Sequence, residues 1–296
     1  MNNGCLAELA GVHKRYGKVI ALGGIDLQVR RGELLAVLGS NGAGKTTAIS
    51  LLLGLQRPDE GSARLFGRPP QDVDTRRQIG VMLQEAALAR SLRVRELVTL
   101  VSSYYPTPYA PDEVLKLTHT ESLAERPYGQ LSGGQKRQAQ FALALCGRPK
   151  LLFLDEPTTG LDIEAREMIW ETLRRIIAGT ASIVLTTHYL EEAERLADRV
   201  VVLAKGKTIA SGTVDELRAL VGKKHVSCRT NVPLDDVRRW PGVAGVSESQ
   251  QRLHLITSNA EAVVRRLMAM DDSLQELEVR RAGLAEAFTE LTQEAE

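Results

Sequence analysis

Hydrophobic residues form two kinds of pattern in the first two thirds of the chain, continuous apolar runs and a helical period. Uninterrupted apolar runs occur in "GELLAVLG" up to residue 39, in "LLFLD" at 151–155 and in "SIVLTT" at 182–187. Such runs are typical of strands buried on both faces. Residues 163–179, between the last two runs, have a helical period that predicts a core face at Met168, Leu173, Ile176 and Ile177. Strands separated by helices predict an α/β core with a mostly parallel sheet.

Other segments of this region have different patterns. Residues 6–30 alternate apolar and polar positions with glycines between them, which predicts antiparallel strands at the N-terminus. Residues 85–148 favour helix, are interrupted by Pro106 and Pro108, and contain no convincing strand. We therefore expect a helical subdomain inserted into the α/β core. The segment "VVVLAKGKTIASG" predicts a hairpin at the end of this domain.

The pattern changes again near residue 223. Strand-like and helix-like segments follow in the order strand, helix, strand, strand, helix, strand, with a final helix after them. The order βαββαβ is that of a ferredoxin-like α+β unit. We therefore predict two domains, residues 1–222 and a small accessory domain at residues 223–296.

Composition excludes some classes of protein. The 296 residues are 43% hydrophobic and 25% charged, with a formal net charge of +1 and 4% aromatics, which favours an ordinary globular protein without a nucleic-acid partner. Three scattered cysteines fit a reducing cytosol. The N-terminus has no signal-peptide pattern, and the longest apolar runs are far too short for a membrane span. If this protein works at a membrane, another chain must cross it.

"GSNGAGKT", at residues 39–46, matches the phosphate-binding pattern G-x-x-x-x-G-K-[ST] between a predicted strand and a predicted helix. Its glycines let backbone N–H groups approach phosphate oxygens at a helix N-terminus. We expect Lys45 to reach the β- and γ-phosphates of a nucleotide and the Thr46 hydroxyl to bind Mg²⁺.

Polar side chains follow three of the predicted strands. Asp155 and Glu156 end "LLFLDEP", His188 follows "SIVLTT" and Gln84 follows "IGVML". Because ligands bind at the carboxyl edge of parallel sheets, we expect Asp155 to hold the Mg²⁺ shell and Glu156 to activate water. A single histidine at a strand end is more often structural, and a single glutamine supports no function by itself.

"LSGGQ" is a second candidate anion site. Ser132 is a good N-cap, and Gly133 and Gly134 expose backbone N–H groups at the start of a predicted helix. The chain has only one set of Lys45, Asp155 and Glu156, so a second site makes sense if it closes over ATP held by another copy. Two head-to-tail subunits would then bury two nucleotides between them.

These motifs together resemble the nucleotide-binding subunit of an ABC transporter. The likeness covers about residues 5–220 and includes, in chain order, "KRYGK", "GSNGAGKTT", Gln84, "LSGGQ", "LLFLDEP", "TTGLD" and His188. "LSGGQ" followed shortly by an Asp-Glu strand end is highly specific. Ser40 departs from the proline, and Thr159 from the serine, that are most frequent in this family at those loop positions.

The resemblance implies a complete site for ATP and Mg²⁺. Glu156 would be the catalytic base, His188 a switch residue, and Lys45 a phosphate ligand active in catalysis. Tyr16 would stack on adenine, and Asp162 would lie at the dimer seam. The implied nucleotide-binding residues are Tyr16, Gly39, Ser40, Asn41, Gly42, Ala43, Gly44, Lys45, Thr46, Thr47, Gln84, Ser132, Gly133, Gly134, Gln135, Asp155 and Asp162. The implied Mg²⁺ ligands are Thr46, Gln84 and Asp155.

The C-terminal segment "LAEAFTELT" at residues 284–292 is similar to the end of exporter ATPases of the bacterial drug and antibiotic type. This likeness implies export through a separate transmembrane permease and a second ATPase subunit, most simply an identical copy. The protein would then be cytoplasmic and peripheral on the inner face of the cell membrane. An importer subunit, a soluble ABC ATPase acting on ribosomes or DNA, and an inactive nucleotide-binding module are the alternatives.

Overall fold

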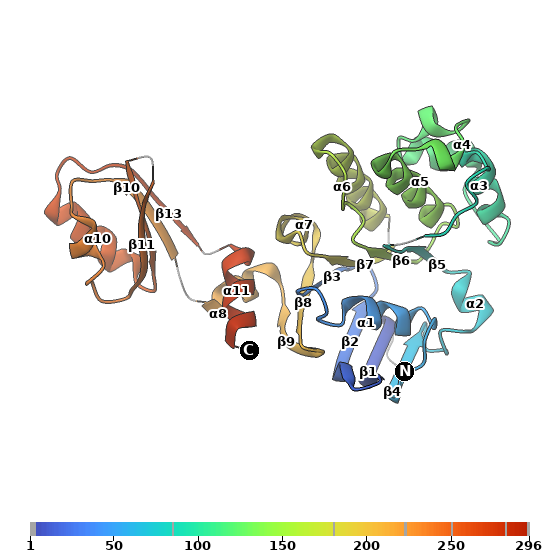
Figure 1. The fold of residues 1–296 in the computed structure, drawn as a ribbon, viewed down its shortest axis with the longest axis horizontal. Coiled ribbons are helices and arrows are strands. Elements are labelled where there is room, and N and C mark those ends of the chain that lie inside the picture. The colour runs from blue at the N-terminus through green and yellow to red at the C-terminus, as the bar shows by residue number, and fades with distance from the viewer. Residues whose placement is uncertain are drawn as a thin grey trace. The chain divides into compact units, whose positions relative to one another are not determined.

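The computed structural model describes residues 4–84, 86–179, 181–221, 224–249, 251–281 and 283–294. It divides the chain into two compact units, Met1–Thr213 and Val214–Glu296 (Figure 1). The division lies before helix α8 (Val214–Val221), whereas the sequence pattern predicts it between residues 222 and 223, which lie outside the described residues. Helix α8 groups with the second unit because it packs against the last helix, α11 (Leu284–Glu294).

A six-stranded sheet forms the centre of the first unit. Its strand order is β5-β6-β7-β3-β8-β9, and all neighbours are parallel except β8 and β9. The bounds are β3 (Leu34–Leu38), β5 (Ile79–Met82), β6 (Leu151–Asp155), β7 (Ser182–Thr187), β8 (Arg199–Ala204) and β9 (Lys207–Gly212). Strands β3, β6 and β7 are buried along their whole length, as their apolar runs predict. The predicted mostly parallel α/β core and the terminal hairpin β8–β9 are confirmed.

The register of this sheet aligns the ends of its central strands. Leu38, the last residue of β3, pairs with Thr187, the last residue of β7. Asp155, the last residue of β6, pairs with Thr186. The loops that follow β3, β6 and β7 therefore leave the sheet at one common edge.

A second, antiparallel sheet packs on one side of the first. It has the order β2-β1-β4, with β1 (Cys5–Tyr16), β2 (Val19–Arg30) and β4 (Glu60–Leu65). The N-terminal strands are thus confirmed, although each of the first two is one long strand of 12 residues. Helix α1 (Lys45–Leu52) lies between the two sheets (Figure 1), and its residues Ile49 and Leu52 join the apolar core there.

The helices between residues 94 and 178 lie on the other side of the central sheet (Figure 1). Helices α3 (Val94–Ser102), α4 (Pro111–Leu117) and α5 (Gly133–Leu145) pack on one another and form the helical region predicted within 85–148. The described residues 86–148 contain no strand. The remaining helices are α2 (Val73–Arg76), α6 (Ile163–Ala178) and α7 (Leu190–Leu196), with short 3-10 turns at Glu121–Leu123 and Tyr128–Gln130.

The buried face of α6 differs in part from the predicted one. Leu173 is fully buried, but Met168, Ile176 and Ile177 are only half-buried. Ile169 and Trp170 take the core positions instead, and the Trp170 indole N–H donates a hydrogen bond to Glu192 on α7 at 3.1 Å. The helical period is compatible with either of two adjacent faces of α6 being buried. Packing against helix α7 determines which of them faces the core.

The second unit contains the predicted βαββαβ order. Its antiparallel sheet has the order β11-β12-β10-β13, and α9 and α10 supply apolar side chains to a core with Val226, Leu255 and Trp240. The bounds are β10 (Lys224–Arg229), α9 (Leu234–Val237), β11 (Val243–Ser249), β12 (Arg252–Thr257), α10 (Ala260–Met270) and β13 (Gln275–Arg281). This strand order is that of a ferredoxin-like fold.

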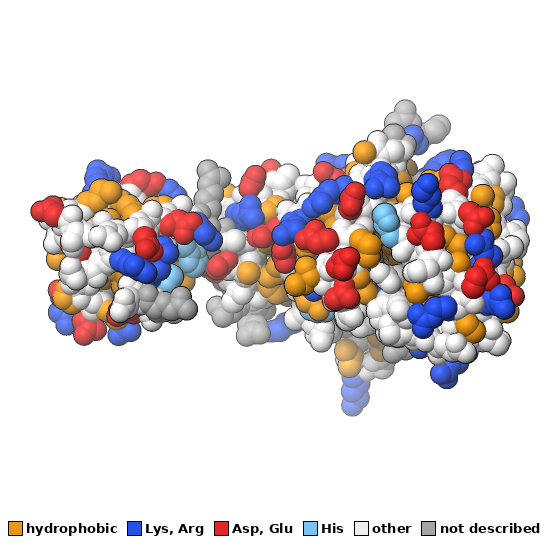
Figure 2. Space-filling view, turned by 90° about the horizontal axis from the view of Figure 1, so that it is seen from above, with side chains coloured by type: hydrophobic (Ala, Val, Ile, Leu, Met, Phe, Trp, Pro, Cys, Tyr) orange, Lys and Arg blue, Asp and Glu red, His pale blue; other side chains and the backbone are white. Residues whose placement is uncertain are grey.

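None of the described helices combines the length and the apolar character that a membrane crossing requires. On the face drawn in Figure 2, acidic and basic side chains are interspersed, in line with the net charge of +1.

Gly80 in β5 allows helix α5 to approach the sheet closely. A Cβ atom at this position would lie 2.0 Å from the carbonyl oxygen of Ala144 in α5, where only backbone movement could relieve the clash. The close approach fixes the distance between α5 and the strand that leads to Gln84.

We therefore expect Gly80→Ala to destabilise the first unit by about 1–3 kcal/mol, the usual cost of overpacking. This corresponds to a fall in Tm of about 2–4 °C for each kcal/mol in a domain of this size. The measurement is thermal unfolding followed by circular dichroism. Gly23→Ala is the matched control, because its added Cβ would meet no atom closer than 3.8 Å. Equal Tm values for the two variants would contradict the close-packing argument.

Candidate nucleotide-binding site

The loop between β3 and α1 has backbone geometry that requires its glycines. Gly44 is the N-cap of α1 with φ of 107°, a left-handed conformation that favours glycine. A Cβ atom at Gly39 would lie 2.7 Å from the carbonyl oxygen of Leu203. The loop "GSNGAGKT" therefore lies directly on the sheet edge and opens into a helix N-terminus, the arrangement that binds phosphate.

Lys45 is buried and directed back over this loop. Its side-chain Nζ donates hydrogen bonds to the carbonyl oxygens of Gly39 at 2.7 Å and Ser40 at 3.2 Å. Burial lowers the pKa of Lys45, and the nearby carboxylates of Glu156 and Asp155 oppose that shift. The ammonium group is therefore held beside the glycine loop.

Asp155 is held by two hydroxyl groups. Its Oδ2 accepts a hydrogen bond from Thr46 Oγ1 at 3.4 Å, and its Oδ1 accepts one from Thr186 Oγ1. The aspartate is only 2% exposed. A carboxylate and a hydroxyl oxygen side by side at a phosphate loop fit Mg²⁺, which uses few protein ligands and completes its shell with water and phosphate. The described residues contain no cluster of three His, Cys, Asp or Glu side chains that could hold a metal without such help.

Glu156 lies where three loops meet. Its carboxylate contacts Gln84 Nε2 at 3.4 Å, Thr159 Oγ1 at 3.4 Å and His188 Nδ1 at 3.2 Å. Its backbone φ is 50°, which is unusual for a residue other than glycine and points to a functional position. The Glu156 N–H donates to the Thr186 carbonyl oxygen at 3.0 Å, which holds this conformation in place.

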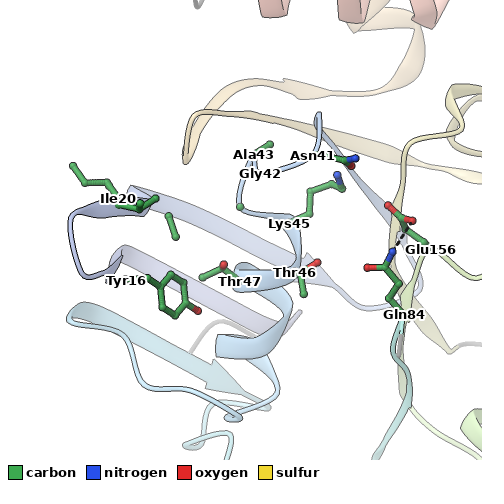
Figure 3. Close-up of a pocket in the computed structure, with 13 residues that line it drawn as sticks. Tyr16, Ile20, Asn41, Gly42, Ala43, Lys45, Thr46, Thr47, Gln84 and Glu156 are labelled. Carbon is green, nitrogen blue, oxygen red and sulfur yellow. Dashed lines mark hydrogen bonds between the residues drawn. The ribbon is translucent and has the colours of Figure 1, made fainter. Parts of the chain in front are cut away.

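These groups border a cavity of about 500 Å³, a size suited to a nucleotide. In Figure 3, Gln84 and Glu156 lie on one side of the loop that carries Lys45, and Tyr16 lies on the other. Tyr16 is 45% exposed. The predicted residues that line the cavity are Tyr16, Asn41, Gly42, Ala43, Gly44, Lys45, Thr46, Thr47, Gln84 and Glu156. Gly39 and Ser40 begin the same loop, Asp155 lies beside Thr46, and His188 contacts Glu156.

"LSGGQ" does not line this cavity. Ser132 caps α5, where its Oγ accepts from the Gln135 N–H at 3.2 Å and its own N–H donates to Gln135 Oε1 at 3.1 Å. Ser132 and Gly133 are exposed, and Gly134 is half-buried. Asp162 is exposed and caps α6 by accepting from the Ala165 N–H at 2.8 Å. Within one chain, these motifs cap α5 and α6 and do not line the cavity.

The structure adds residues that the sequence argument missed. Val19, Ile20 and Ala21, at the start of β2, line the cavity next to Tyr16. Val19 and Ile20 are 65% and 53% exposed although they are apolar. The only signal for them in the sequence was that two apolar residues follow shortly after Tyr16. Arg137, within the "LSGGQKRQ" stretch, contacts the backbone around Gln84 and Glu156. Its contacts join segments far apart in sequence, so no local pattern shows them.

Comparison with known proteins agrees with this geometry. Residues 22–159 match the family model described as ABC transporter. The chain is 37% identical to a daunorubicin resistance ATP-binding protein of Streptomyces coeruleorubidus, over 95% of this chain and 94% of that protein. It is 40% identical to Nod factor export ATP-binding protein I of Rhizobium sp. (strain N33), over 75% of this chain and 74% of that protein.

A solved structure shares the fold of most of this chain. A dimeric bacterial ABC transporter cassette matches with a TM-score of 0.63 and 25% identity, covering 70% of this chain and 98% of that one. The phosphate loop, the acidic strand end and these relatives lead to one conclusion. The chain belongs to the ABC transporter family, is one of its ATP-binding subunits, and is an ATPase.

Proposed function

We propose that this chain hydrolyses ATP to drive export across a membrane through a permease that is a separate chain. The observation that carries this proposal is the meeting of Lys45, Asp155, Glu156 and Gln84 at one sheet edge beside a nucleotide-sized cavity. Two relatives named for drug resistance and for export support the outward direction. The match to the drug-resistance protein extends through the second unit, because it covers 95% of the chain.

The phosphates of ATP bind at the "GSNGAGKT" loop in this proposal. Backbone N–H groups at the start of α1 contact the phosphate oxygens, and Lys45 neutralises their charge. Thr46 and Asp155 would hold Mg²⁺, with Gln84 as a further candidate ligand, and the ion would neutralise charge on the phosphates. Tyr16, with Val19 and Ile20 beside it, offers an exposed flat surface to adenine.

Glu156 acts as the general base. Its carboxylate accepts the proton of the attacking water, and the contacts from Gln84, Thr159 and His188 fix its direction. His188 holds one carboxylate oxygen at 3.2 Å, which leaves the other oxygen toward Gln84. The three contacts come from three loops, so the base is correctly placed only when those loops are in place together.

The exposed N-terminus of α5 serves a second copy of the chain. Ser132, Gly133, Gly134 and Gln135 contribute to the nucleotide site of the opposite subunit, and Asp162 lies at the seam. The support is that these caps face solvent in one chain, away from the cavity. The dimeric relative supports an arrangement of two cassettes. In the cell, the subunit would be cytoplasmic and attached to the inner membrane face through its permease.

Glu156→Gln tests the base. We expect the affinity for MgATP to stay within about twofold of wild type, because the amide keeps the size of the side chain. Turnover should fall by about 10²-fold or more, the usual contribution of a general base. Phosphate release measures turnover, and nucleotide fluorescence titration measures binding. Glu164→Gln, at an exposed position in the first turn of α6, is the matched control. Wild-type turnover in the Glu156 variant would reject this role.

Ser132→Arg tests the contribution of "LSGGQ" to a second copy. The bulky cation replaces the cap of α5 outside the cavity of its own chain, so MgATP affinity should be unchanged. Turnover should fall at least about tenfold. If two chains must associate for hydrolysis, wild-type turnover per chain rises with protein concentration, and this rise should be absent in the variant. An unchanged rate and the same concentration dependence as wild type would rule out the cross-subunit role.

Membrane coupling is tested by affinity purification from native cells. The tagged Glu156→Gln chain is extracted in mild detergent with MgATP, and the copurifying proteins are identified by mass spectrometry. We expect a polytopic membrane protein in stoichiometric amount, and we expect it to be a permease that exports its substrate. Recovery of ribosomal or DNA-bound material without a membrane partner would reject the transport proposal, and a permease that carries substrate inward would reject the direction.

A further inference from the structure

Arg137 on α5 lies beneath the catalytic edge of the sheet and joins two of its loops. Its Nη1 donates to the carbonyl oxygens of Leu83 at 2.9 Å and Gln84 at 3.2 Å. Its Nη2 donates to the carbonyl oxygens of Asp155 at 3.3 Å and Glu156 at 2.6 Å. One guanidinium group therefore connects the backbone of the Gln84 segment to the backbone of the catalytic strand end.

This guanidinium is buried without a carboxylate in direct contact. Arg137 is 8% exposed, and its described partners are four carbonyl oxygens and one amide oxygen. Burial lowers its pKa, while the charges of Asp155 and Glu156 favour the cation. Burying a cation is costly unless it is fully hydrogen-bonded, and an apolar side chain would pack a core at lower cost. The guanidinium group instead holds the backbone carbonyl groups of Gln84 and Glu156 at a fixed distance from each other.

A further chain of hydrogen bonds leads from Arg137 to Tyr128 and on to the Leu92 backbone. Arg137 Nη1 also donates to Gln140 Oε1 at 3.2 Å, and Gln140 Nε2 donates to the Tyr128 hydroxyl at 2.7 Å. The Tyr128 N–H donates to the carbonyl oxygen of Leu92, in the segment that follows Gln84. Arg137 and Ser132 share α5, so a displacement of the helix N-terminus moves the guanidinium with it.

We propose that Arg137 is a positioning residue that links α5 and the Gln84 segment to the end of β6. When "LSGGQ" of one chain closes on the nucleotide of a second copy, Arg137 carries that displacement to Gln84 and Glu156 of its own site. Arg137 does not line the nucleotide cavity, so it acts through these two residues. The inference rests on the proposed roles of Gln84, Glu156 and "LSGGQ" in hydrolysis.

Arg137→Lys is the primary variant. Lysine keeps the charge, but its single ammonium group cannot reach both pairs of carbonyl oxygens as the planar guanidinium does. We expect kcat for ATP hydrolysis to fall about tenfold or more, with the MgATP dissociation constant within about twofold of wild type. Arg174→Lys is the matched control, because it makes the same substitution at an exposed position of α6. A loss of MgATP affinity and Tm with an unchanged kcat per folded chain would show that Arg137 is only structural and would overturn the proposal.

A double-mutant cycle with Gln84→Ala separates positioning from general destabilisation. If Arg137 acts through Gln84, the loss of kcat in the double variant should be at least about fivefold smaller than the product of the two single losses. Multiplicative losses would overturn the proposal. Should the Arg137→Lys chain not fold, the same cycle is run with Gln140→Met, which removes the link to Tyr128 and keeps the four carbonyl contacts. We expect a smaller loss of kcat that is again coupled to Gln84→Ala, and multiplicative losses there overturn the proposal equally.

Glu156→Gln distinguishes the failure of this inference from failure of the proposed function. If that variant loses turnover while the Arg137 cycle is multiplicative, the catalytic assignment stands and the positioning role of Arg137 is wrong. If Glu156→Gln keeps wild-type turnover, the proposed function itself fails, and the positioning role falls with it.

Discussion

The in-register pairing of β3, β6 and β7 is the constraint on which the site depends. Because Leu38 pairs with Thr187 and Asp155 pairs with Thr186, three loops leave the sheet at the same level. Parallel strands with this register bring a glycine loop, two acids and a histidine together, although the glycine loop lies more than a hundred residues before the acids and the histidine in sequence. Both faces of the sheet are covered, so these strands are buried along their whole length.

Hydroxyl groups then set the positions of the acids at this edge. Thr186 donates to the Asp155 carboxylate, and its backbone carbonyl accepts from the Glu156 N–H. Asp155 is thereby held against the sheet, while Glu156 turns away from it with φ of 50°. The two neighbouring acids consequently face different partners. Asp155 faces the Thr46 hydroxyl and suits a metal, and Glu156 faces Gln84 and His188 and suits a base.

Close packing connects the catalytic edge of the sheet to helix α5. Gly80 lets α5 lie against β5, and Arg137 on that helix binds the carbonyl oxygens on both sides of the catalytic edge. The helix that carries "LSGGQ" at its start therefore contacts the sheet in two ways, through tight backbone approach and through a buried cation. The second unit has its own apolar core around Val226, Leu255 and Trp240.

Much of the protein was determined by sequence alone. The apolar runs predicted the central strands, the alternation predicted the N-terminal sheet, and the βαββαβ order of the second unit followed from its periodicity, because burial on two faces, one face or a helical stripe leaves a distinct local pattern. The phosphate loop and the acids at the strand end were likewise readable, since their chemistry requires fixed spacing within a few residues.

Tertiary structure decided what depends on neighbours distant in sequence. The buried stripe of α6 was chosen by α7, and α8 joined the second unit because α11 covers it. The φ of Glu156 and the contacts of Arg137 arise where separate loops meet. A local pattern records how much of a side chain is buried but not which distant backbone it binds, and for this reason only the folded chain shows how its catalytic edge is held together.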